Sequence, residues 1–303
     1  MRRQITSVAL SAVLGIGALA AQADVPPTGL AALSGADWMQ TARQDRHVPT
    51  AEEMTDGLMK YFSRPDVQRR FAAQYASQYG VNGAKADVIG EMVKTLFGDR
   101  NVVMRLAEVI VQMTTGDESP EEAFGISRSA AMAVITSLSD TGVLRLPPAE
   151  LDDFFRIVTE TRLTLPIDLY REVTVRQYNA LGDERLVARI NRHYRNLSDA
   201  DFRKYFSAVI HAVRAEAADY PPRTALTDIQ RDIAVKALLK QFAIQFDRLG
   251  IPEEDWMRIL EAPENPAAAS VQDLRTYETV ILRAVSALRG DVRHWALVLS
   301  YGG

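Results

Sequence analysis

Apolar residues recur along most of this chain at spacings of three and four, which is the period of an amphipathic α-helix. In residues 83–97, for example, Ala86, Ile89 and Val93 share one helical face, and Gly98 ends the pattern. No segment of useful length alternates with a period of two, so strands are not expected. The pattern predicts an all-α protein, a multi-helix bundle of about ten helices.

Capping residues and prolines mark where the helices begin. Thr50 and Glu53 fit a capping box, Thr227 is an N-cap residue, and Pro148 starts another helix. The expected helices cover residues 51–62, 64–79, 83–97, 101–115, 130–138, 148–163, 166–181, 184–196, 199–218, 228–249, 252–260 and 270–300. Residues 101–115 and 130–138 are apolar almost all round and are expected at the centre of a helical layer.

The most regular apolar pattern lies in residues 270–300, where a and d positions of one heptad frame are apolar across four heptads. These positions hold Val271, Leu274, Ile281, Val285, Leu288, Val292, Trp295 and Leu299. Glu278 is the one break. The favoured partner for this seam is helix 228–249 of the same chain. Its matching residues are Val235, Leu239, Phe242, Phe246 and Leu249. A homodimer through residues 270–300, or a helix of another protein, is the alternative.

The N-terminus has the pattern of a secretory signal peptide. Arg2 and Arg3 form a charged start, an apolar stretch follows over residues 5–21, and small residues precede Asp24. The uninterrupted apolar core is shorter than the roughly 20 residues of a membrane-spanning helix. We therefore expect residues 1–23 to be cleaved, which gives a periplasmic or secreted product with no stable membrane anchor.

Proline and glycine residues mark the boundaries of segments in the rest of the chain. Residues 24–49 contain several of both and are expected to form a flexible lead-in. Residues 50–303 form the helical domain. The main change of composition within it covers residues 142–148, so a sub-boundary near residue 145 would give two helical domains.

Composition narrows the classes of function. The chain is 47% hydrophobic and 24% charged, which is ordinary for a folded domain. It has no cysteine, which excludes disulfides, a thiolate nucleophile and cysteine-ligated metal centres. Loss of Arg2 and Arg3 with the signal peptide lowers the formal charge from −4 to −6. This acidity argues against nucleic acid or an anionic membrane as the main partner.

Catalytic patterns are weak. Neighbouring carboxylates occur at residues 52–53, 121–122, 152–153 and 253–255, but each set is expected in the first turn of a helix, where negative charge is stabilised by the helix dipole. Glu118 followed by Ser119 matches the acid of some cell-wall lytic enzymes, although Pro120 favours an N-cap role for Ser119. The four histidines lack the spacing of a metal site. No pattern predicts a catalytic residue, a cofactor or a metal.

One basic cluster is a candidate binding site. Arg185, Arg189, Arg192, His193 and Arg195 lie in the predicted helix 184–196. The spacings of four and three place three of the arginines on one face. Such a face could hold an acidic partner, a phosphate or a carboxylate-bearing glycan. Acidic residues on either side of the cluster favour a solvated or internally paired face instead.

Three functions stay open. The first is a non-enzymatic, exported helical protein that binds another protein or associates with the envelope. The second is an immunity-type inhibitor of a periplasmic toxin. The third is a cell-wall hydrolase, which would need a desolvated carboxyl group with a raised pKa.

Overall fold

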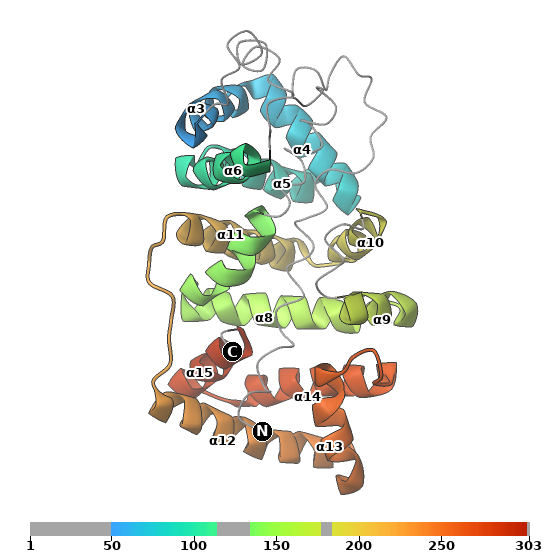
Figure 1. Ribbon diagram of the computed structural model, residues 1–303. Coiled ribbons are helices and arrows are strands. Elements are labelled where there is room, and N and C mark those ends of the chain that lie inside the picture. Colours follow the sequence, from blue (N-terminus) through green and yellow to red (C-terminus); the bar gives the residue numbers. More distant parts are fainter. Residues whose placement is uncertain (1–49, 114–133, 177–183, 302–303) are drawn as a thin grey trace. The chain divides into compact units, whose positions relative to one another are not determined.

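The computed structural model describes residues 50–113, 134–176 and 184–301, which form helices and turns (Figure 1). Within these ranges there is no strand, and the prediction of an all-α fold is confirmed. No helix in the described ranges is both long and apolar enough to cross a membrane. The expected signal peptide and lead-in, residues 1–49, lie outside the described residues.

The described residues divide into two compact units, and each unit is built from two separate stretches of the chain. From residue 50 the described chain lies in unit 2, enters unit 1 at Val143, returns to unit 2 before residue 184, and enters unit 1 again at Pro221. The first crossing adjoins the composition change at residues 142–148. Because the chain returns, no single cut in the sequence separates the two units.

Aromatic side chains from three helices pack together in the core of unit 2. Its helices are α3 (Ala51–Phe62), α4 (Pro65–Tyr79), α5 (Gly83–Phe97), α6 (Arg100–Met113), residues 134–142, α10 (Glu184–Tyr194) and α11 (Asp199–Ala217). Helix α5 packs against both α4 and α11, and α10 packs against α4. The rings of Tyr194 and Tyr205 have centroids 4.6 Å apart, and Tyr79 meets Phe206 edge-on at 5.3 Å. These contacts fix α10 to the core of unit 2.

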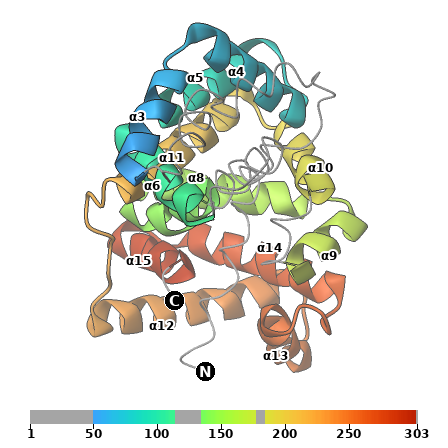
Figure 2. The same cartoon turned by 45° about the horizontal axis from the view of Figure 1, so that its top comes forward.

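Unit 1 is arranged around α14. Its elements are η2 (Val143–Arg145), α8 (Pro148–Leu163), α9 (Ile167–Arg176), α12 (Asp228–Arg248), α13 (Glu253–Glu261), η4 (Ala262–Glu264), α14 (Val271–Ala287) and α15 (Gly290–Tyr301). Helix α14 contacts α8, α9, α12 and α13, and both views show it between α8 and α12 (Figure 2). A residue in the middle of α14 is therefore covered on several sides.

The caps expected from the sequence are present. The backbone N–H of Glu53 donates to Thr50 Oγ1, and the Glu53 carboxylate accepts from the Thr50 N–H at 2.8 Å. Thr227 forms the same reciprocal box with Gln230 at the start of α12. These local hydrogen bonds satisfy N–H groups that have no partner within the helix.

The prediction of one continuous helix over residues 270–300 is wrong. Helix α14 ends at Ala287, Leu288 is extended with φ −72° and ψ 161°, and Gly290 begins α15 with φ +55°. A positive φ is readily adopted only by glycine, so Gly290 allows the chain to change direction. The apolar seam is thus divided between two helices.

The divided apolar seam packs against α12, the partner that the sequence favours, but the buried residues of α12 are not all the expected ones. Both α14 and α15 pack against α12. Of the residues expected to match the seam, Phe242 and Phe246 are buried, whereas Leu239 is 48% exposed. Ala234 and Leu238 lie in the core instead. The shift follows from apolar residues on several faces of α12, which leave its orientation open when the sequence is considered alone.

Gly142 marks a close approach between two helical segments of unit 2. A Cβ at this position would lie 2.1 Å from the backbone oxygen of Ala212 in α11 and 3.1 Å from Glu216 Cβ. Only glycine fits there without moving a backbone.

Replacement of Gly142 by alanine should lower the free energy of unfolding by about 2 kcal/mol, because the new methyl group overlaps a carbonyl oxygen. Gly57→Ala in α3 is the matched control. A Cβ at Gly57 meets nothing within 4 Å, so this change should raise stability by up to about 1 kcal/mol. Urea denaturation of both variants tests the difference, and equal midpoints would contradict the close approach.

Candidate functional site

Helix α10 presents one apolar face and one basic face. Leu186, Ile190 and Tyr194 lie one turn apart and are buried, whereas Arg189 and Arg192 are exposed and His193 is half-buried. We call Arg189, Arg192 and His193 the α10 surface. The structure confirms that these residues lie on a helix, which ends at Tyr194 and not at residue 196. The side chain of Arg185 lies outside the described residues.

Lys85 of α5 fixes the C-terminal end of α10. Its ammonium group donates to the backbone oxygens of Arg195 and Leu197 at 2.7 and 2.6 Å. It also lies 3.6 Å from an oxygen of Asp199 and 5.7 Å from the centroid of the Phe202 ring. A cation at a helix C-terminus offsets the negative end of the dipole and satisfies carbonyl groups that have no partner within the helix. The α10 surface is therefore held at its end as well as along its buried face.

Positive charge dominates the surroundings of His193. Burial lowers the pKa of its imidazole, and the charges of Arg195 and Arg189 lower it further. The imidazole is therefore neutral at pH 7, and the arginines carry the charge of the surface. Arg195 itself points toward Gly80 at the end of α4, where a Cβ would lie 3.7 Å from its Nη1 atom. Of the sequence cluster, Arg189, Arg192 and His193 thus lie on the helix, and Arg195 lies just beyond its end.

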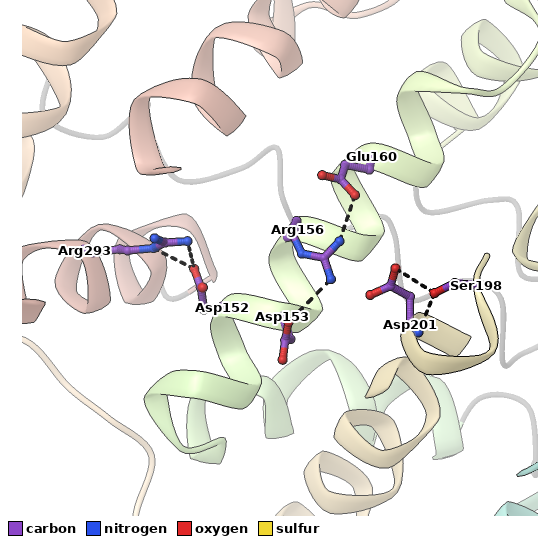
Figure 3. Close-up of polar contacts among 7 residues, drawn as sticks. All are labelled: Asp152, Asp153, Arg156, Glu160, Ser198, Asp201 and Arg293. Atoms are coloured by element: carbon purple, nitrogen blue, oxygen red, sulfur yellow. Dashed lines mark hydrogen bonds and ion pairs between the residues drawn. The ribbon is translucent and has the colours of Figure 1, made fainter. Parts of the chain in front are cut away.

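The carboxylates at residues 152–153 have a different role from the one expected (Figure 3). Helix α8 begins at Pro148, so the pair lies beyond the first turn. Asp152 accepts from Arg293 Nε at 2.7 Å, which joins α8 to α15. Asp153 lies 3.5 Å from Arg156, which also binds Glu160 at 3.0 Å. The expectation that this pair lies in the first turn of a helix is therefore wrong, and both carboxylates form ion pairs instead.

The other acidic candidates give no catalytic arrangement. Residues 52–53 and 253–255 lie in the first turns of α3 and α13, as expected. Helix α11 also begins with acidic residues, and its N-cap is Ser198, whose Oγ accepts from the Asp201 N–H at 3.0 Å (Figure 3). Glu118 and the pair 121–122 lie outside the described residues. Within the described ranges no group of three or more His, Asp or Glu residues is placed to hold a metal ion.

Asp140 has a perturbed carboxyl group that no sequence pattern indicates. It lies in the helical residues 134–142 of unit 2, where burial raises its pKa to about 7. Its charge acts on the buried hydroxyl of Tyr205 in α11. A carboxyl group with this pKa can exchange a proton near neutral pH. One such group does not supply the paired carboxylates that glycoside hydrolysis uses.

Unit 1 contains a buried ion pair between α8 and α14. Arg162 Nη2 lies 2.7 Å from Glu278 Oε1, and the two side chains are 7% and 6% exposed. The same Nη2 donates to Thr174 Oγ1 of α9 at 3.2 Å. The Tyr170 ring lies below both Arg162 and Arg275, whose Cζ atoms are 5.8 and 5.1 Å from its centroid. Arg162, Tyr170 and Arg275, from three helices, therefore act on one buried carboxylate.

In this cluster, burial and the neighbouring charges shift the pKa values of Glu278 and Arg162 in opposite directions. Burial raises the pKa of Glu278, while Arg162, the nearby hydroxyl of Tyr170 and Arg275 act to lower it. Burial alone would lower the pKa of Arg162, but Glu278 raises it overall. Burial also raises the pKa of Tyr170, so its phenol keeps its proton. Glu278 is the residue that interrupts the heptad pattern, and that interruption was the one signal of this cluster in the sequence.

No family model, no curated protein and no solved structure shows significant similarity to this chain.

The raised pKa of Asp140 predicts a pH-dependent stability. The folded state holds this proton up to about pH 7, whereas the unfolded chain releases it near pH 4. Stability should therefore fall as the pH rises from 4 to 7, and the loss should persist above pH 7. Asp140→Asn should raise the free energy of unfolding at pH 8 by up to about 4 kcal/mol and leave it unchanged at pH 4.

Urea denaturation at both pH values measures this effect. Asp87→Asn is the control, because Asp87 is an exposed carboxylate of the same unit. It should change stability little at either pH. Equal behaviour of the two variants would show that Asp140 does not hold its proton at neutral pH.

Proposed function

We propose that this chain is an exported, non-enzymatic helical protein that binds an acidic segment of another protein through the α10 surface. The supporting observation is the pair of exposed arginines, Arg189 and Arg192, on a helix whose opposite face is buried in the core. A guanidinium can bind a carboxylate through two parallel hydrogen bonds and stays charged at any physiological pH.

The fixed position of α10 supports a binding role. Its buried face meets α4, and the ring contact between Tyr194 and Tyr205 joins it to α11. Lys85 bonds the backbone that follows the helix. A surface that is already ordered loses little conformational entropy when a partner binds, so more of the interaction energy appears as affinity.

The charge distribution favours an acidic partner in one orientation. The whole chain has a formal charge of −4, and −6 without residues 1–23. An acidic partner is repelled by most of such a surface and attracted where arginines gather. Local complementarity of this kind increases the rate of association and determines the orientation of binding. Because the arginines are exposed, binding should weaken as the salt concentration rises.

The place of action in this proposal follows from the N-terminal pattern. Arg2, Arg3 and the apolar residues 5–21 support export, and the absence of cysteine is compatible with an oxidising compartment. The partner is then a protein of the envelope, or a toxin that reaches the periplasm. Its identity decides between an envelope factor and an immunity-type inhibitor.

Charge reversal on α10 tests the proposed function. The tagged full chain and its Arg189→Glu/Arg192→Glu variant are purified after chemical cross-linking from the organism's envelope fraction, and the co-purified proteins are identified by mass spectrometry. Binding of the best candidate, or of an aspartate- and glutamate-rich peptide from it, is then measured by fluorescence anisotropy. The variant should bind at least about tenfold more weakly, because it loses two charge-assisted contacts.

A matched double variant controls for overall charge. Arg69 and Arg203 are exposed residues of the same unit that lie on α4 and α11. Arg69→Glu/Arg203→Glu makes the same change in net charge and should leave the affinity within about twofold at moderate salt. Equal losses in the two double variants would show that net charge, and not the α10 surface, determines binding.

A further inference from the structure

The buried cluster in unit 1 contains more positive than negative charge. Arg162 and Arg275 are cations, Glu278 is a carboxylate that interacts with both of them, and Tyr170 keeps its proton. The cluster therefore carries a net charge of about +1, counted with a fully ionised carboxylate. The excess charge lies at Arg275, beside the buried ion pair, and an anion there would be attracted by both guanidiniums.

Several donors in the cluster also have no acceptor. Arg162 uses Nη2 for Glu278 and Thr174, while its Nε and Nη1 atoms are buried without a hydrogen-bond partner. Arg275 donates from Nη2 to the backbone oxygen of Leu165, and its buried Nε has no acceptor. Buried N–H groups in native proteins are nearly always satisfied by protein, water or an ion.

The position of these groups limits the size of a ligand. Arg162 is 6% exposed and lies among α8, α9 and α14. A large molecule could reach it only if these helices separated. Arg275 is only half-buried, so its side of the cluster faces solvent and provides a route of entry.

We propose that this cluster binds one small monovalent anion, of the size of a halide or formate, between the guanidiniums of Arg162 and Arg275. The anion accepts hydrogen bonds from both arginines and from the Tyr170 hydroxyl. It lies away from Glu278, which occupies the Nη2 side of Arg162. The proposal does not depend on the function assigned to α10, because every residue in it belongs to unit 1.

Bromide and chloride are suitable probes for this site. Crystals of the full chain grown in sodium bromide should give an anomalous peak within hydrogen-bond distance of Arg162 and Arg275. In solution, the full chain should broaden the chloride NMR line, and bromide should reverse the broadening by competition. The absence of both the peak and the broadening would overturn the proposal.

Three variants assign the signal to the cluster. Arg275→Gln removes one charge and should weaken chloride binding at least about tenfold, since a charge-assisted hydrogen bond is lost. Tyr170→Phe removes only a hydroxyl and should weaken binding several-fold, which keeps the test valid if Arg275→Gln unfolds the chain. Arg248→Gln changes an exposed arginine of α12 and should have no effect. Unchanged binding in both cluster variants would place the anion elsewhere.

Discussion

A buried arginine side chain is no longer hydrated, so its charge needs an anion inside the protein. In unit 1 the guanidinium of Arg162 forms an ion pair with the carboxylate of Glu278. The two residues lie on α8 and α14, which belong to the separate stretches of chain that build this unit. Removal of one member of such a buried pair leaves an unpaired charge in the core. The arrangement of α8, α9 and α14 is thus linked to the formation of a single ion pair, while the apolar faces of these helices supply most of the buried surface.

In unit 2, contacts between aromatic rings join stretches of the chain that are distant in the sequence. Tyr79 lies in the first stretch, and Tyr194, Tyr205 and Phe206 lie in the stretch that returns. Aromatic pairs combine a large buried area with a preferred geometry, so they also fix orientation. The orientation of α10 follows from this packing, because Tyr194 points into the core and Arg189 and Arg192 then lie on the outer face. The proposed binding surface is therefore a direct product of the core of unit 2.

The sequence was sufficient for features that depend on neighbouring residues. The helical period, the capping boxes at Thr50 and Thr227, and the two faces of α10 all follow from spacings of three and four. Features that depend on distant residues were missed or misassigned. The heptad pattern continues through Gly290, so it gave no sign that the backbone bends there. Asp152 has the pattern of a first-turn carboxylate, but its partner Arg293 comes from a distant part of the sequence.

The buried polar groups show the same limit. Glu278 interrupts an apolar seam, which indicates something unusual but does not identify Arg162, 116 positions earlier in the chain, as its partner. Asp140 follows a short apolar segment, and its raised pKa comes only from burial. Both effects arise from tertiary packing, which helical periodicity does not contain.

The coupling between Arg162 and Glu278 is the most direct test of this account. Arg162→Met, Glu278→Leu and the double variant are compared with the parent chain by urea denaturation, and the coupling energy is taken from the double-mutant cycle. Each single change should cost about 3 kcal/mol or more, because it leaves a buried charge unpaired, and the double variant should cost clearly less than the sum of the two. Two small, additive losses would contradict the central role of the pair.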